Sequence, residues 1–162
     1  MNIYNPRQTV LVTCRGKIVS FGKEEEIDEI IPLEWHSPAS SNPKRYAIFI
    51  HRDSLAAKLI RESKVWAINF MPFELAEAIT LAAKHSAEMH AKWEKIKLSP
   101  IECEVIDCPR VREALAWLEC ELIQEVDCGD HVLFLGRIVF SRSERGGKRA
   151  FCIDGKYTTT IE

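Results

Sequence analysis

The chain has 162 residues, of which 46% are hydrophobic and 28% are charged. This balance is typical of a folded globular domain and not of a disordered or membrane-spanning chain, so we expect residues 1–162 to form a single domain. The 22 basic and 24 acidic residues give a formal net charge of -2, which provides no general attraction for nucleic acid. No apolar run approaches the ~18 residues of a membrane span. We therefore expect a cytoplasmic protein with neither nucleic acid nor a membrane as a partner.

The six cysteines are scattered along the chain, and a domain of this size does not need disulfides to fold. We expect reduced thiols. No Cys-x-x-Cys pair occurs, and the nearest spacing, Cys103 to Cys108, has no second Cys or His pair at the distance that zinc ligands require. The sequence therefore predicts no metal site.

Short strands dominate the first half of the chain. The β-branched run Thr9–Cys14 predicts a strand, and we expect residues 18–21 to return antiparallel after a turn at residues 15–17. Two more strands are predicted at Arg45–His51 and Lys64–Phe70, with a short amphipathic helix between them that Asp53 or Ser54 can cap. A second helix is predicted after Pro72, because apolar residues there recur at helical spacing.

The second half of the chain predicts two long antiparallel strands. After a short helical or turn-like piece at residues 110–116, residues 117–126 alternate, with Glu119 and Glu121 expected to point outward. A turn at residues 127–130 leads into a strand with an internal Gly136, and a polar turn at residues 143–148 precedes an extended tail. The predicted fold class is therefore mainly β with helices, an antiparallel split β-barrel with its helices packed outside, rather than a doubly wound parallel sheet.

Two polar segments could bind a ligand. Residues 35–43 (WHSPASSNP) offer backbone N–H groups and hydroxyls between prolines, which could line the polar edge of a planar ligand, although an ordinary connecting loop has the same composition. Residues 51–54 (HRDS) end a strand and open a helix, where free N–H groups, a guanidinium and a hydroxyl could hold a phosphate. The alternative for this junction is a simple helix cap with a solvated Arg52.

One histidine, His131, lies at the mouth of a predicted strand, where it could meet a substrate or cofactor or be structural. The motifs GxSxG, GxGxxG and GxxxxGK[ST] are absent, so the sequence supports no Ser-His-Asp hydrolase, Rossmann site or P-loop.

Taken in order, these segments resemble the flavin reductase and flavoredoxin family, whose fold is the FMN-binding split barrel. The landmarks that carry the resemblance are the early strand TVLVTC, the W-x-S-P-x-S-x-x-P pattern, R-x-S, V-x-x-I-N-F, the late Gly-Asp-His followed by F-L-G-x-I, and a closing D-G-K-Y. Two segments depart from the family pattern: FGKEEEIDEI replaces an Asp-Gly-x-x-Asn stretch, and KHSAEMHAKWEKIKL matches the lysine-aromatic segment only through Lys92 and Trp93.

The resemblance implies non-covalently bound FMN, NADH or NADPH as a possible donor, and a homodimer with an unidentified small-molecule or protein redox partner. It implies that residues 35–41 bind the edge of the isoalloxazine ring, that residues 51–54 bind the phosphate, and that His131 lies near the nicotinamide or flavin. The residues expected to contact the cofactor are Trp35, His36, Ser37, Pro38, Ala39, Ser40, Ser41, His51, Arg52, Asp53, Ser54 and Asn69, with His131 as the catalytic candidate.

Three functions remain open from the sequence. A reductase that uses NAD(P)H and a flavoredoxin-type electron carrier differ only in whether a nicotinamide can reach the flavin. The third possibility, which the FGKEEEIDEI departure suggests, is a split-barrel binding or interaction protein that has lost its flavin.

Overall fold

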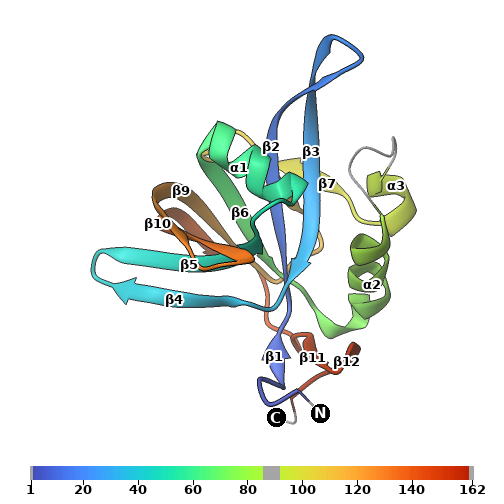
Figure 1. The fold of residues 1–162 in the computed structure, drawn as a ribbon. Helices are drawn as coiled ribbons and strands as arrows, with labels where there is room; N and C mark the ends of the chain where they lie inside the picture. Colours follow the sequence, from blue (N-terminus) through green and yellow to red (C-terminus); the bar gives the residue numbers. More distant parts are fainter. Residues whose placement is uncertain (1, 86–91, 161–162) are drawn as a thin grey trace.

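The computed structural model describes residues 2–85 and 92–160, and it consists mainly of antiparallel β-structure (Figure 1). Seven strands form the main sheet in the order β3-β2-β6-β9-β10-β5-β4. Their bounds are β2 Val10–Ser20, β3 Lys23–Leu33, β4 His36–Ser41, β5 Lys44–His51, β6 Val65–Phe70, β9 Ala116–Asp127 and β10 His131–Ser143. Neighbouring strands are antiparallel throughout this sheet. The predicted class, a mainly β antiparallel split barrel, is confirmed.

Two smaller sheets complete the β-structure. One joins the two ends of the chain, because β1 (Arg7–Gln8) pairs with β11 (Phe151–Ile153), which in turn pairs with β12 (Lys156–Thr158). The other is a hairpin of β7 (Pro100–Glu102) and β8 (Pro109–Val111). Figure 1 shows the N- and C-terminal segments side by side below the main sheet.

The helices lie outside the sheet, as predicted (Figure 1). They are α1 (Leu55–Ser63), the 3₁₀ turn η1 (Phe73–Leu75), α2 (Ala76–Lys84) and α3 (Lys92–Ile96). The Ser54 hydroxyl caps α1 by accepting a hydrogen bond from the N–H of Ala57 at 3.2 Å. Among the described residues, no helix is both long and apolar enough to cross a bilayer.

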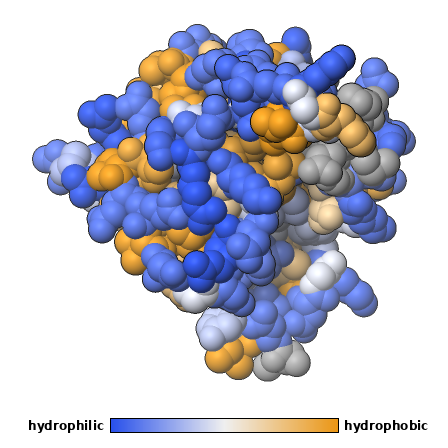
Figure 2. Space-filling view, turned by 45° about the horizontal axis from the view of Figure 1, so that its top comes forward, coloured by the Kyte–Doolittle hydropathy of each residue, from blue (hydrophilic) through white to orange (hydrophobic). Residues whose placement is uncertain are grey.

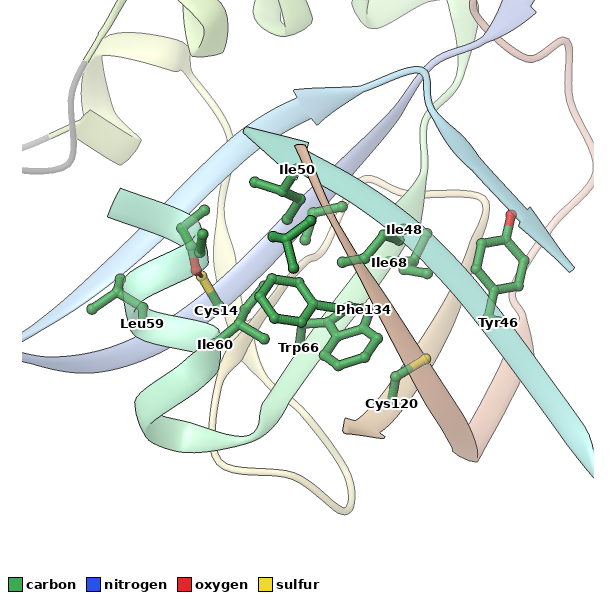
Figure 3. Close-up of a cluster of buried hydrophobic side chains, with 14 of the residues drawn as sticks. Cys14, Tyr46, Ile48, Ile50, Leu59, Ile60, Trp66, Ile68, Cys120 and Phe134 are labelled. Carbon is green, nitrogen blue, oxygen red and sulfur yellow. Dashed lines mark hydrogen bonds between the residues drawn. The ribbon is translucent and has the colours of Figure 1, made fainter. Parts of the chain in front are cut away.

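The main core lies between the sheet and α1 (Figure 3). Trp66, Phe134 and Ile48 are fully buried at its centre, and Leu59 and Ile60 of α1 pack onto them. A second cluster lies beneath α2 and α3, where Ile79 and Ile96 meet the sheet. On the surface shown in Figure 2, hydrophobic side chains form separate patches among hydrophilic ones.

The first hairpin differs from its prediction. Strand β2 runs without interruption to Ser20, and the turn lies at Phe21 and Gly22, which have φ angles of 51° and 75°. The segment FGKEEEIDEI therefore supplies this turn and most of the return strand β3. Gly16, which suggested a turn, serves close packing instead: a Cβ there would lie 2.6 Å from a Glu62 carboxylate oxygen and 2.9 Å from a Leu59 methyl.

Three further expectations are corrected in whole or in part. The polar stretch after Trp35 is the edge strand β4 and not an irregular loop, and an edge strand tolerates Pro38. The predicted helical or turn-like piece at residues 110–116 begins with the last residues of strand β8 and continues as a turn at residues 112–113, so the turn is confirmed and the helix is not formed.

Glu119 lies on the face of β9 opposite Leu118 and Cys120, as the alternation predicts, but this face is not exposed to solvent and Glu119 is fully buried. Its carboxylate accepts hydrogen bonds from the N–H groups of Glu104, Val105 and Ile106 at 2.7, 2.8 and 3.2 Å. Because residues 104–106 cover this part of β9, a polar side chain meets backbone donors there instead of water.

Gly136 of β10 lies against the buried indole of Trp66, and this contact generates a prediction about stability. A Cβ at position 136 would lie 2.6 Å from two indole carbons and 3.0 Å from the Cβ of Cys120. We expect Gly136→Ala to lower the free energy of unfolding by about 1–3 kcal/mol, the usual cost of overpacking a core. Gly146→Ala is the matched control, because nothing lies within 4 Å of its added Cβ. Equal urea midpoints for the two variants would contradict the prediction.

Candidate functional site

Three predicted residues meet where β5 ends and β10 begins. The register of these strands places His131 directly opposite His51, and their rings lie 5.7 Å apart. The Trp35 carbonyl accepts a hydrogen bond from the N–H of Phe49 at 2.9 Å, which fixes Trp35 beside the same strand. The indole of Trp35 lies 4.7 Å from the His131 ring. The structure therefore gathers Trp35, His51 and His131 from three separate parts of the sequence.

A pocket of about 370 Å³ opens beside this cluster. It is lined by Tyr4, Arg7, Trp35, Phe49, Cys128, Asp130 and His131. The Asp130 carboxylate lies 2.7 Å from Nδ1 of His131, and this hydrogen bond lowers the pKa of Asp130. Among the described residues, Nε2 of His131 has no hydrogen-bond partner, so it is the ring nitrogen left for a ligand. The mixture of aromatic faces with one histidine and one arginine suits a planar ligand that carries polar atoms.

A second pocket, of about 450 Å³, adjoins the first, and Arg7 lines both. Its lining residues are Pro6, Arg7, Gln8, Glu34, His36, Pro38, Tyr46, Phe70 and Arg149. The Arg149 guanidinium lies 4.9 Å from the centre of the Phe70 ring, and within the described chain no carboxylate lies within 4.0 Å of it. The second pocket therefore combines two basic side chains with predicted residues of β4.

His36 is held in one tautomer within this pocket. Its Nε2 lies 2.8 Å from the Gln8 carbonyl, which can only accept, so Nε2 carries the proton and Nδ1 accepts from the Tyr46 hydroxyl at 2.8 Å. Burial lowers the pKa of His36 below its ordinary value of 6.5, and burial raises the pKa of Tyr46 to about 12. Both side chains therefore stay neutral at physiological pH.

The other predicted residues of β4 lie along the free edge of the main sheet. Ser37, Ala39 and Ser41 are exposed, Ser40 is half-buried, and Ser37 donates its hydroxyl hydrogen bond to the Pro38 carbonyl. Because β5 is the only partner of β4 in the described sheet, the opposite edge presents unpaired backbone groups. These small residues leave that edge open to a ligand or to another chain.

The junction at residues 51–54 has the predicted position, but the side chains of Arg52 and Ser54 already have partners. Arg52 donates to the Gly129 carbonyl at 2.9 Å and lies 3.4 Å from the Asp127 carboxylate, so it fastens the β9–β10 turn. Ser54 caps α1, and the N–H of Asp53 lies 3.4 Å from Nδ1 of His51. Only His51 of these four residues contacts the aromatic cluster described above.

Asn69 lies apart from both pockets and is fully buried. Its amide nitrogen donates to the Leu11 carbonyl and the Thr13 hydroxyl, and its amide oxygen accepts from the N–H of Val111 at 2.7 Å. These bonds link β6 to β2 and β8, which gives Asn69 a structural role.

Sequence reasoning missed several pocket residues, above all Arg7, Gln8 and Arg149. Arg7 and Gln8 reach the site through the small sheet, in which Arg7 pairs with Cys152 and Gln8 with Phe151, and Arg149 precedes this sheet and forms an isolated β-bridge with Pro72. No pattern in the neighbouring sequence reveals that pairing. The basic residues Arg7 and Arg149 near the two ends of the chain could only have been considered as candidate phosphate ligands.

Comparison with known proteins identifies the family of the chain. Residues 3–160 match the family model described as the flavin reductase like domain. A protein of Archaeoglobus fulgidus described as uncharacterized is 29% identical over 129 residues, which cover 80% of this chain and 72% of that protein.

Two solved structures share the fold. An NADH:FAD oxidoreductase of Streptomyces globisporus superposes with a TM-score of 0.84 at 16% identity, covering 97% of this chain and 87% of that one. An FMN-binding protein of Thermus thermophilus gives 0.82 at 22% identity, with coverage of 97% and 87%. At these identities the superpositions establish the fold.

The half-buried His36 generates a prediction about pH. Because its pKa is lower in the folded state than in the unfolded chain, its contribution to stability is complete above pH 6.5 and is lost as the pH falls toward the lowered pKa. We expect histidine-ring NMR to give His36 a titration midpoint below 6.5. We also expect His36→Gln, whose amide can still donate to Gln8, to flatten the fall in unfolding free energy between pH 6.5 and acidic pH. A midpoint at or above 6.5 would show that the ring is not desolvated.

Proposed function

Because the chain belongs to the flavin reductase-like domain family, we propose that it is an oxidoreductase that binds FMN non-covalently in the groove formed by the two adjoining pockets. The observation that carries the proposal is their juxtaposition: aromatic side chains line one pocket, two arginines line the other, and Arg7 lines both. Their volumes, about 370 and 450 Å³, lie within the range usual for small-molecule sites.

The aromatic pocket suits the isoalloxazine ring. Trp35 is 41% exposed despite its size, and Tyr4 meets it edge to face with ring centres 6.4 Å apart. An exposed indole beside a pocket can stack on a planar ring without further rearrangement. In this proposal Trp35 packs against the ring, and the edge of β4 offers backbone N–H groups to its polar rim.

The basic pocket suits the phosphate. Arg149 has no carboxylate partner within 4.0 Å in the described chain, and a guanidinium binds phosphate oxygens by two parallel hydrogen bonds. Arg52 and Ser54, which the sequence suggested for this role, use their side chains to hold the β9–β10 turn and to cap α1. The observations therefore favour Arg149 over the junction at residues 51–54. Arg7 donates its Nε–H to the Glu34 carbonyl at 2.8 Å, and among the described residues its two terminal NH2 groups remain for a ligand.

A buried polar atom supports the presence of a ligand in this groove. The amide nitrogen Nε2 of Gln8 is buried without a hydrogen-bond partner among the described residues, and Gln8 lines the basic pocket. Leaving such a donor unpaired costs roughly 1–3 kcal/mol. A carbonyl or phosphate oxygen of bound FMN would remove that cost.

Bound FMN would supply hydride and electron transfer, while the protein supplies binding, orientation and electrostatics. His131, oriented by Asp130, would place Nε2 at the mouth of the aromatic pocket, where the donor NADH or NADPH would approach. The names of two solved structures of the same fold agree with such a donor: an NADH:FAD oxidoreductase in complex with NAD and FAD fragments, and a flavin reductase complexed with NADP+.

We propose in addition that the protein is a homodimer. Tyr4 and Ile3 are 58% and 82% exposed beside the groove, and a second copy of the chain would cover them. Light scattering on the purified protein measures this directly, and a monomer at micromolar concentration would refute it.

The experiment that tests the proposed function is a flavin titration followed by a turnover assay. We expect the protein to bind FMN and to accelerate oxidation of NADH or NADPH with an added acceptor. We expect Trp35→Ala to weaken FMN binding about ten-fold, because an aromatic pair contributes roughly 0.5–1.5 kcal/mol beyond area burial. Ile123→Ala is the control, since this exposed side chain of β9 lines neither pocket.

The outcomes separate the three candidate functions. Binding with turnover supports the reductase, and stable binding without turnover supports a flavoredoxin-type carrier. A protein that binds neither FMN nor FAD would be a split-barrel binding protein that has lost its flavin.

The position of the phosphate generates a separate prediction. We expect Arg149→Ala to weaken FMN binding at least ten-fold, because a hydrogen bond to a charged group contributes roughly 1.5–3 kcal/mol. Binding of riboflavin, which lacks the phosphate, should change little in the same variant. Fluorescence titration with both ligands measures the difference.

Two further variants serve as controls, one for the loss of a positive charge and one for the alternative position of the phosphate. Arg145→Ala removes a guanidinium from the same polar segment that does not line the groove, so FMN binding should be retained. Arg52→Ala should also retain it; selective loss of FMN binding in Arg52→Ala would instead place the phosphate at the junction of residues 51–54.

A further inference from the structure

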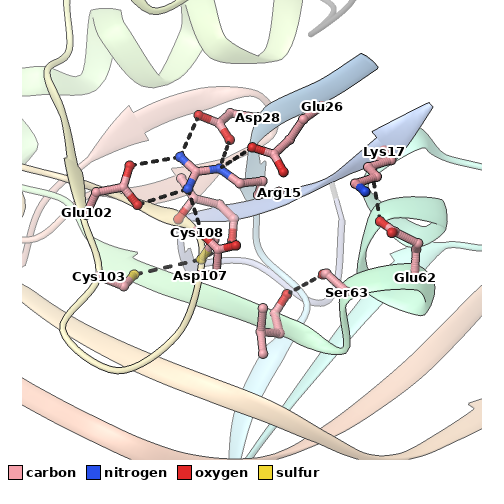
Figure 4. Close-up of polar contacts among 12 residues, drawn as sticks. Arg15, Lys17, Glu26, Asp28, Glu62, Ser63, Glu102, Cys103, Asp107 and Cys108 are labelled. Atoms are coloured by element: carbon pink, nitrogen blue, oxygen red, sulfur yellow. Dashed lines mark hydrogen bonds and ion pairs between the residues drawn. The ribbon is translucent and has the colours of Figure 1, made fainter. Parts of the chain in front are cut away.

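The β7–β8 hairpin brings two cysteines together. Glu102 pairs with Pro109 in the register of this hairpin, so Cys103 and Cys108 are the next opposed pair, and the N–H of Cys103 donates to the Cys108 carbonyl at 3.0 Å. Directly opposed residues of antiparallel strands have Cα atoms ~4.5–5.5 Å apart, within the range that a disulfide spans. Both are free thiols, with their sulfur atoms 3.8 Å apart (Figure 4).

The segment between the two cysteines is fixed on both sides. The buried Glu119 carboxylate accepts the N–H groups of residues 104–106. On the outer side, the Arg15 guanidinium bonds to Asp107 at 2.8 Å and to Glu102 at 2.9 and 3.0 Å (Figure 4). These contacts hold the opposed backbone positions, so the thiols can meet by side-chain rotation.

We propose that Cys103 and Cys108 form a reversible dithiol–disulfide site that reacts with small disulfide oxidants. The Cys103 thiolate attacks one sulfur of the oxidant RSSR, forms a mixed disulfide and releases one thiol, RSH, once the leaving thiolate takes up a proton. Cys108 then loses its proton, attacks the Cys103 sulfur and releases the second RSH. The protein gains one S–S bond, and the oxidant is reduced to two thiols.

The roles of the two thiols follow from their surroundings. Cys103 is half-buried and open to a reagent, whereas Cys108 is fully buried. The hydrogen bond with Cys103, together with burial, raises the pKa of Cys108, so Cys108 keeps its proton until the mixed disulfide has formed beside it. Cys103 is therefore the attacking thiol and Cys108 the resolving thiol.

The other cysteines provide a contrast. Burial raises the pKa values of Cys14, Cys120 and Cys152, and all three side chains are buried. Cys128 is exposed, but its sulfur bonds to the Val126 carbonyl and, in the part of the chain described, has no cysteine partner. An oxidant should therefore leave Cys128 as a mixed disulfide and convert only Cys103 and Cys108 to an internal one.

Oxidation should also change a contact between Cys108 and strand β2 of the main sheet. The Cys108 thiol lies 3.8 Å from the Thr13 carbonyl of β2. Rotation of the Cys108 sulfur toward Cys103 removes this contact while the Glu119 anchor remains.

The test uses the full chain with Cys128→Ser, which removes the exposed competing thiol, incubated with oxidised glutathione. Remaining thiols are then alkylated, and the peptide that contains residues 103–108 is analysed by mass spectrometry. We expect this peptide to lose two hydrogens and to carry no alkyl group, and we expect reduction by a dithiol to restore both alkylation sites. Full alkylation of both cysteines after oxidation, or a stable glutathione adduct on Cys103, would overturn the proposal.

Single variants assign the two roles. Cys108→Ser should trap glutathione on Cys103, and Cys103→Ser should leave Cys108 unreacted, with circular dichroism confirming that each variant is folded. Glutathione trapped on Cys108 in Cys103→Ser would overturn the order of attack. No flavin takes part in this reaction, so its result is independent of the proposed cofactor.

Discussion

The pairing of β10 with β5 is the constraint on which the candidate site depends. Because side chains alternate between the two faces of a strand, a shift of one residue would turn His131 away from His51. Arg52 stabilises the end of this strand pairing, because its N–H donates to the Asp130 carbonyl and its guanidinium donates to the Gly129 carbonyl. These two hydrogen bonds hold the β9–β10 turn against the end of β5, and the position of the His131 imidazole follows from this attachment.

Buried polar groups attach the outer segments to this frame. The Lys92 ammonium of α3 lies 2.6 Å from the Glu29 carboxylate and 2.7 Å from the Ile30 carbonyl, and both charged side chains are almost fully buried. Asn69 ties β6 to β2 and β8. Removing one partner of such a group leaves the other desolvated and unpaired, which is more costly than losing the contact alone. These groups therefore specify where α3 and the β7–β8 hairpin attach, while the apolar core supplies most of the stability.

Local patterns in the sequence predict the elements whose cause is local. The strands at residues 45–51 and 64–70, the cap at Ser54 and the turn at residues 127–130 follow from β-branched runs, a capping residue and a glycine. The failures have non-local causes: Gly16 is required by its contact with α1, and the outer face of β9 at Glu119 is buried because residues 104–106 cover it. Trp35, His36, Pro38 and His131 were predicted and line the two pockets. The basic wall of the second pocket, Arg7 and Arg149, was not predicted, because it forms only when the two ends of the chain pair.

That basic wall is carried by the shortest strands of the site. Strand β1 has two residues and β11 has three, and the segment between β10 and β11 is held to the rest mainly by single backbone bonds, such as that from the N–H of Phe73 to the Lys148 carbonyl. A ligand that contacts Trp35 on the main sheet together with Arg7 and Arg149 on the end segments would add to the hydrogen bonds that already join these parts, such as those from Arg7 to the Glu34 carbonyl and from His36 to the Gln8 carbonyl. Binding and ordering would then be linked, because a ligand that binds only the assembled groove stabilises the assembled groove. In this arrangement the main sheet fixes the aromatic half of the groove, and the basic half is completed by the ligand itself.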